Sequence, residues 1–122
     1  MPEIGDIVET TVDMPEGNLR VGAKGTIVHC HSNNAYEVEF TNEEGETLDF
    51  MPLSPEQFIV VWRVETQEWV TVAEQAAAIV KNLPDNTAKE VLDFARFFIG
   101  KTSFSKLDAE DTEAASFGKT LG

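Results

Sequence analysis

Residues 19–30 read LRVGAKGTIVHC. In this stretch Gly22 and Gly25 stand in front of a β-branched run, a pattern that predicts a turn followed by a strand. Two more strand-like runs flank it, GDIVET at residues 5–10 and AYEVEF at residues 35–40. Short strands joined by glycine-bearing and polar loops predict a small β-barrel.

Residues 36–40 carry the clearest period-two pattern in the chain, because apolar side chains alternate there with Glu37 and Glu39. Successive side chains of a strand point to opposite faces, so one face of this strand is expected to be buried and the other to meet water. In the preceding strand the same alternation leads us to place Val28 and Cys30 on the core side.

The next segments predict the remaining strands. Residues 41–46 are polar and contain a glycine, which favours a hairpin loop. Leu48 and Phe50 are then expected to face the core in a fourth strand, which Pro52 ends because proline lacks the amide hydrogen. After a single helical turn, a fifth strand is predicted over residues 59–64.

The chain resembles the KOW-type and related SH3-like barrels in its opening GD-x-V at residues 5–8 and in its turn G-x-x-GTIV at residues 22–28. With AYEVEF at residues 35–40 and LSPEQ at residues 53–57, the span 4–64 is similar to a small bacterial family of uncharacterised SH3-like proteins. The resemblance implies a five-stranded SH3-like β-barrel. It implies no particular activity, because this fold hosts many unrelated functions.

The chain changes from strand-like to helical patterns in its second half. Thr71 is a good N-cap and Glu74 completes a capping box, which predicts a first helix of about 13 residues. Pro84 breaks that helix. A second helix is expected over residues 87–99, with Gly100 as its C-terminal cap.

The second predicted helix has an apolar face too wide for one neighbouring helix, because Phe94, Phe97 and Phe98 widen it. A hairpin of about 30 residues buries too little area to be stable alone, so it is expected to pack on the barrel, on a second copy or on another protein. Residues 71–101 resemble the helical hairpin of small bacterial antitoxin-like proteins, through Leu-Pro followed by EVLDFxxF at residues 90–97.

Together these patterns predict an α+β chain of three parts. Residues 1–66 form the SH3-like barrel, residues 67–101 the two-helix hairpin and residues 102–122 a flexible C-terminal tail. The tail is rich in Ser, Thr, Ala, Asp and Glu, a composition typical of segments that stay disordered when free.

The chain is strongly acidic, with 22 acidic and 9 basic residues and a net charge of −13. The balance disfavours contact with nucleic-acid phosphates and favours a basic protein partner. No apolar run approaches the roughly 20 residues that span a bilayer, and no signal peptide is apparent, so we expect a cytoplasmic protein without membrane contact. The single cysteine, Cys30, fits a reducing compartment.

The residue pattern contains no catalytic constellation, and we expect a non-enzymatic protein without a cofactor. His29, Cys30 and His31 form the one cluster that suggests a metal site. Adjacent residues of a strand face opposite ways, so Cys30 does not join the two histidines, and two histidines alone make a weak site. We therefore predict no metal.

The lead hypothesis is a non-enzymatic protein-binding module, an antitoxin or immunity-like protein that neutralises a basic partner such as a toxin. Acidic residues would speed its association with that partner and phenylalanines would form the buried hot spot. The predicted partner-binding residues are Glu37, Glu39, Glu43, Glu44, Glu46, Asp49, Phe94, Phe97 and Phe98. The alternatives are an accessory or scaffolding subunit whose helical hairpin forms a homodimer, and an RNA-binding KOW-type module, which the charge disfavours.

Overall fold

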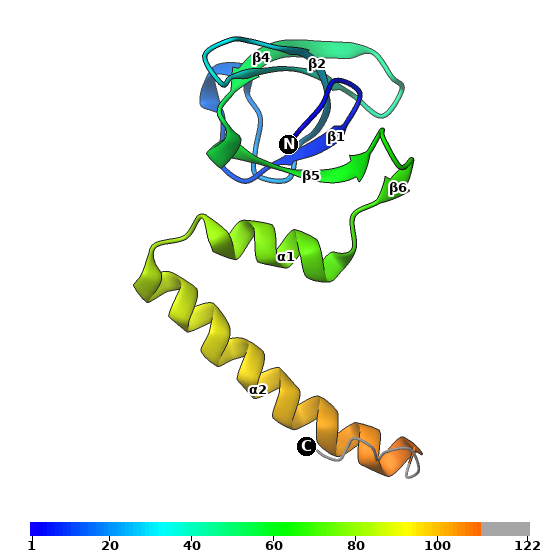
Figure 1. Ribbon diagram of the computed structural model, residues 1–122, viewed down its shortest axis with the longest axis vertical. Helices are drawn as coiled ribbons and strands as arrows, with labels where there is room; N and C mark the ends of the chain where they lie inside the picture. Colours follow the sequence, from blue (N-terminus) through cyan, green and yellow to red (C-terminus); the bar gives the residue numbers. More distant parts are fainter. Residues whose placement is uncertain (111–122) are drawn as a thin grey trace. The chain divides into compact units, whose positions relative to one another are not determined.

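A computed structural model of the chain describes residues 1–110, with side chains up to residue 100. Within these residues, six strands form one antiparallel sheet in the order β4-β3-β2-β1-β5-β6, and two α-helices follow it (Figure 1). The chain divides into two compact units, Met1–Asn82 and a second unit that begins at Leu83. The predicted α+β class is confirmed.

The strands are β1 (Ile7–Thr10), β2 (Lys24–Cys30), β3 (Tyr36–Thr41), β4 (Thr47–Leu53), β5 (Phe58–Arg63) and β6 (Glu68–Trp69). Two short 3₁₀ turns are η1 (Pro15–Gly17) and η2 (Pro55–Gln57), and the helices are α1 (Val72–Lys81) and α2 (Asp85–Glu110). Within the first unit the sheet curves around its own inner face, as the ribbon shows (Figure 1). The side chains of that face are therefore shielded from water.

The hydrophobic core of the first unit is built from this inner face. The largest fully buried apolar side chains come from four different strands, and they are Phe40, Ile27, Leu53, Val8 and Val38. Tyr36 packs edge-on against Phe58, with ring centroids 5.6 Å apart. The alternation predicted for residues 36–40 is confirmed, since the apolar side chains are buried and the glutamates lie on the outer face.

Asp6 joins the start of the first unit to the end of β5. Its side chain is only 2% exposed. Oδ2 accepts the backbone N–H of Glu3 at 2.9 Å, and Oδ1 accepts the backbone N–H of Val64 at 2.9 Å. Gly5 sets up this turn with φ at +100°, a backbone conformation that L side chains rarely adopt. One buried carboxylate thus fixes two chain segments far apart in sequence.

Replacing Asp6 with alanine is expected to lower the free energy of unfolding by about 2 kcal/mol, because two N–H donors in a water-poor site lose their acceptor. Asp6→Asn keeps one acceptor oxygen and should lie between the parent chain and Asp6→Ala. Urea denaturation followed by circular dichroism measures both changes. Equal stabilities for Asp6→Ala and the parent would show that these hydrogen bonds contribute nothing net.

The predicted closed barrel of five strands is wrong in two respects. β6 pairs with β5 through a turn in which Gln67 has a φ of 57° and donates its backbone N–H to the Arg63 carbonyl at 2.8 Å. In the part of the chain that the structure describes, β4 and β6 are the two ends of the strand order, so the sheet is open. A two-residue strand is too short to produce a period-two pattern, which explains why β6 was missed.

The predicted inward positions of Val28 and Cys30 are also wrong. Both are exposed, whereas Ile27 is fully buried. The pairing of β2 with β3 shifts register between Ile27 and His29, which is a β-bulge. A bulge breaks the strict alternation of faces on which the prediction depended.

In the fourth strand, the side chains that were predicted to face the core are exposed instead. Leu48 and Phe50 are 58% and 52% exposed, whereas Met51 is buried. Pro52 does not end the strand but lies within β4, opposite Glu37 of β3. Because β4 is at the end of the sheet, the missing N–H of proline interrupts no second ladder of hydrogen bonds.

Helix α1 begins with the predicted capping box. The Thr71 hydroxyl oxygen accepts the Glu74 backbone N–H at 3.1 Å, and the Glu74 carboxylate accepts the Thr71 N–H at 3.4 Å. α1 packs on the face of β5 that carries the buried Ile59 and Val61. The first compact unit ends at Asn82 and the second begins at Leu83. The domain boundaries predicted at residues 66 and 101 remain predictions.

Helix α2 continues through Gly100, so the predicted end at that residue is wrong. A glycine inside a helix costs about 1 kcal/mol relative to alanine, which lowers helix stability without stopping the helix. Residues 102–110, predicted as part of a flexible tail, are helical, and residues 111–122 lie outside the described residues. Neither α1 nor the described length of α2 combines the length and apolar character needed to cross a membrane.

Candidate protein-binding surfaces

The acidic residues predicted to meet a partner lie on β3, on β4 and in the loop between them. Glu37 and Glu39 occupy the outer face of β3. The residue opposite Glu39 on β4 is Phe50, and Leu48 is exposed on the same strand two positions earlier. The structure thus adds two exposed apolar side chains to the predicted acidic surface.

Sequence reasoning missed Leu48 and Phe50 as surface residues because both alternations of residues 48–53 contain apolar side chains. Leu48 and Phe50 fit one face as well as Met51 and Leu53 fit the other. Only the register with β3, where Met51 lies opposite the buried Val38, decides between them.

The two β3 glutamates are held by neighbouring side chains. A hydrogen bond of 3.0 Å joins His31 Nε2 and Glu37 Oε1, and the Thr47 hydroxyl donates to Glu39 Oε2 at 2.6 Å. The His29 ring meets the His31 ring edge-on, with centroids 4.7 Å apart. Within residues 1–100, no group of three or more His, Cys, Asp or Glu side chains is placed to hold a metal ion.

The β3–β4 loop owes its shape to Asn42. Its Oδ1 accepts the backbone N–H groups of Glu44 and Glu46 at 3.0 and 2.9 Å, and its Nδ2 donates to Glu46 Oε1 at 2.9 Å. Gly45 has a φ of 87°, as predicted for this loop. Glu43 and Glu44 are exposed at the loop. This loop therefore presents its carboxylates to solvent on a well-defined backbone.

Asp49 has a structural role on β4, the strand at one end of the sheet order. Its Oδ1 accepts the backbone N–H of Phe50 at 2.8 Å. Residues two apart in a strand direct their N–H groups to the same side, and the residue two along, Pro52, has no N–H to offer. The edge of β4 that faces away from β3 is therefore poor in donors, which discourages pairing with another strand.

The double variant Asp49→Ser/Pro52→Thr restores two backbone donors at this edge and is expected to form more oligomer than the parent chain at equal concentration. Light scattering coupled to size-exclusion chromatography measures the change. Glu43→Ser alone is the control, because it removes one negative charge, as Asp49→Ser does, and leaves the backbone N–H groups of β4 unchanged. Identical masses for the double variant and the control would contradict the role of Asp49 and Pro52.

The segment that contains β1 to β4 and the first part of β5 matches a known family model. Residues 4–60 match the family described as Domain of unknown function (DUF4926). No curated protein and no solved structure matches the chain. The DUF4926 match contains both the Gly5-Asp6 turn and residues 19–30, and it stops before β6. The prediction of an uncharacterised family is therefore supported by a match over residues 4–60, and the SH3-like and antitoxin-like resemblances remain predictions.

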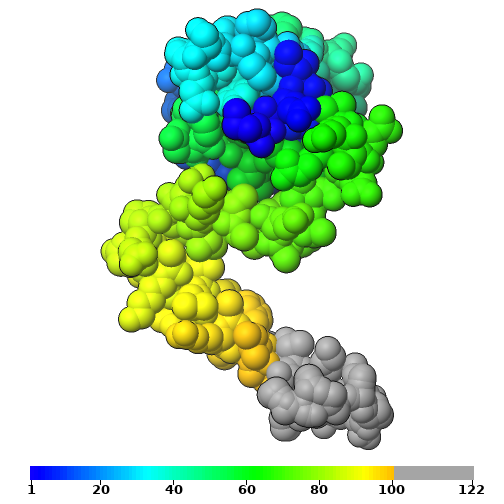
Figure 2. Space-filling model, viewed as in Figure 1, coloured from blue at the N-terminus to red at the C-terminus, as the bar shows by residue number. Residues whose placement is uncertain are grey.

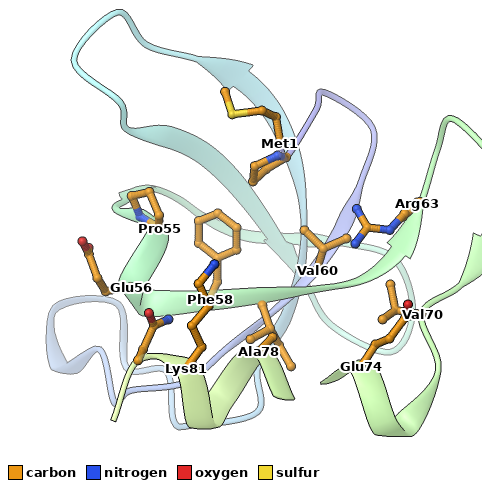
Figure 3. Close-up of a pocket in the computed structure, with 13 residues that line it drawn as sticks. Met1, Pro55, Glu56, Phe58, Val60, Arg63, Val70, Glu74, Ala78 and Lys81 are labelled. Atoms are coloured by element: carbon orange, nitrogen blue, oxygen red, sulfur yellow. The ribbon is translucent and has the colours of Figure 1, made fainter. Parts of the chain in front are cut away.

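A groove in the first unit lies between the N-terminus, η2, β5 and α1, and it has a volume of about 420 Å³ (Figure 3). Its lining mixes apolar side chains such as Phe58 with Arg63 and Lys81. A hydrogen bond from its own backbone N–H, and one from Ser54, hold the pKa of Glu56 in this lining below its ordinary value. The N-terminal residues lie on the surface of the unit, dark blue in the space-filling view (Figure 2).

The predicted aromatic residues lie on α2, outside the DUF4926 match. Phe94, Phe97 and Phe98 are 45–61% exposed. The rings of Phe94 and Phe98 meet edge-on with centroids 4.7 Å apart, and those of Phe97 and Phe98 do so at 5.8 Å. The structure therefore brings the three phenylalanines together as one cluster on the helix surface.

Proposed function

We propose that the chain is a non-enzymatic protein-binding module that neutralises a basic partner protein, in the manner of an antitoxin or immunity protein. The proposal rests on the apolar surface of α2. Six of its large apolar side chains are each 39–63% exposed, and they are Val91, Leu92, Phe94, Phe97, Phe98 and Ile99. Contiguous exposed apolar surface of this kind marks protein interaction sites.

The net charge of −13 supports a basic partner. Complementary charge raises the rate of association and disfavours acidic or nucleic-acid partners. In the first unit, the exposed carboxylates of the β3–β4 loop supply part of this field. We therefore assign charge the role of steering the partner and the phenylalanines the role of holding it.

We further infer that the sheet of the first unit is related to the SH3-like barrels. The turn glycines at residues 5 and 22 support this relation, since both have positive φ. So does the 3₁₀ turn η2, which directly precedes β5 as expected. On this view the sheet is a stable carrier, and binding is a property of the surfaces it presents.

A growth assay in the native host tests the proposed function. Genes next to the one for this chain are expressed singly, and those encoding basic proteins are screened for growth inhibition. We expect one such protein to inhibit growth, co-expression of the full chain to restore growth, and the two proteins to form a salt-sensitive complex. Absence of any inhibitory basic neighbour would overturn the proposal.

The competing occupant of the α2 surface is a second copy of the chain, as in an accessory subunit that dimerises. The mass of the purified full chain in solution separates the two cases. A monomer that becomes a heterocomplex on adding the basic protein supports the proposal. A stable homodimer that does not bind the basic protein favours the accessory subunit.

A further inference from the structure

A shallow hollow on α2 is lined by two carboxylates and two phenyl rings. Glu90, Asp93, Phe94 and Phe97 border an open volume of about 460 Å³. All four side chains are exposed. The hollow therefore offers negative charge directly beside aromatic surface, within about two turns of one helix.

The two rings of the hollow are held by the third phenylalanine. Phe94 and Phe97 are nearly parallel, with 13° between their planes and 6.3 Å between their centroids. Phe98 packs edge-on against both of them. Phe98 thus restricts how both rings turn. The faces of aromatic rings carry negative electrostatic potential.

The geometry points to an arginine side chain of the partner as the group that this hollow takes, an assignment that rests on the protein-binding function proposed above. A guanidinium is planar and stacks on aromatic faces, while its N–H groups donate to carboxylates. The aliphatic stem of arginine covers apolar ring surface. A lysine ammonium is compact and more strongly hydrated, so it fits this combination less well.

The chain already seats one guanidinium beside this hollow. Arg96 Nη1 lies 3.3 Å from Asp93 Oδ1, and both side chains are more than half exposed. Such an exposed pair is weak, so an arginine from a partner competes for Asp93. Glu90 forms no salt bridge within residues 1–100, which leaves its carboxylate open to a second guanidinium.

A titration of the full chain followed by NMR tests the assignment. The probes are N-acetylarginine amide, N-acetyllysine amide and N-acetylcitrulline amide, each added at constant ionic strength. Citrulline has nearly the shape of arginine without its charge. We expect arginine to shift the ring signals of Phe94 and Phe97 and the carboxylate carbon of Glu90, lysine to bind about fivefold more weakly, and citrulline to produce no saturable shift.

Two variants locate the effect within the hollow. Phe94→Leu/Phe97→Leu keeps apolar surface and removes the ring faces, and Glu90→Gln/Asp93→Asn keeps the shape and removes the charge. Each is expected to weaken arginine binding about fivefold or more. Glu65→Gln, which removes one exposed carboxylate from the first unit, is the control and should leave binding unchanged. Equal binding of lysine, saturable binding of citrulline or full affinity in the leucine variant would overturn the arginine assignment.

The arginine site and the proposed function can each be contradicted without contradicting the other. A chain that neutralises a basic protein while arginine shifts no signal of Phe94 or Phe97 overturns the arginine site alone. Saturable arginine binding in a chain that neutralises no basic protein supports the site and overturns the proposed function.

Discussion

Gly25→Ala is expected to lower the free energy of unfolding of the first unit by about 3 kcal/mol. Gly25 is buried in β2, where it lies between Val8 of β1 and Phe40 of β3. A Cβ added here would lie 2.6 Å from Val38 Cγ1 and 2.8 Å from the Glu39 carbonyl oxygen. The side chain can shift, but the carbonyl oxygen belongs to a hydrogen-bonded strand, so relief requires the sheet itself to move.

Urea denaturation of the parent and of Gly25→Ala measures this loss, and a third variant shows its origin. Val38→Ala in the Gly25→Ala background removes the closest side-chain contact and leaves the carbonyl oxygen in place. We therefore expect a partial rescue relative to the sum of the two single changes. Gly100→Ala is a comparison with no expected loss, because a Cβ there meets no atom within 4 Å and alanine favours a helix interior by about 1 kcal/mol. A Gly25→Ala chain as stable as the parent would contradict the crowding.

If the chain acts as proposed, Phe98→Ala is expected to weaken binding of the basic partner by about 2 kcal/mol or more, which is about thirtyfold, because aromatic side chains at the centre of an interface dominate its energy. Phe98 contacts both other phenylalanines of the cluster. Its loss therefore removes its own apolar area and also the support of the neighbouring rings. Isothermal titration with the partner identified by the growth assay measures the affinity.

Urea denaturation of Phe98→Ala checks that the first unit stays folded, since Phe98 itself belongs to the second unit. Phe50→Ala is the matched control, since Phe50 is a similarly exposed phenylalanine on the outer face of the sheet. We expect this control to bind the partner nearly as tightly as the parent chain. Equal losses in the two variants would mean that the sheet face, and not α2 alone, carries the interface.

The local features were predictable because short-range geometry decides them. The glutamates of β3 alternate with buried residues, Gly45 takes positive φ, and Thr71 caps α1 with Glu74, all as predicted. Each of these depends on a few neighbouring residues and on backbone sterics. The clustering of the α2 phenylalanines could equally be predicted from the sequence, because residues three and four apart on a helix are neighbours.

The wrong predictions concern side chains whose burial depends on pairing with a strand that is distant in sequence. Ile27 rather than Val28 is buried because of a bulge against β3, and Met51 rather than Phe50 faces the core because of the β3–β4 register. Neither the position of the bulge nor the strand register can be predicted from a stretch whose two faces are both partly apolar. Gly100 was misread for a related reason, since a glycine permits a helix to end without requiring it.

The sequence by itself determined the β-then-α order, the turn glycines, the N-cap of α1 and the acidic and aromatic residues available for binding. These depend on chain geometry within a few residues and on composition. The tertiary structure alone decided that the sheet is open, that β6 extends it, that Asp6 anchors Val64 and that Leu48 and Phe50 reach the surface. Those features depend on pairing between segments far apart in the chain, where the energy comes from shared burial and hydrogen bonding that no single segment encodes.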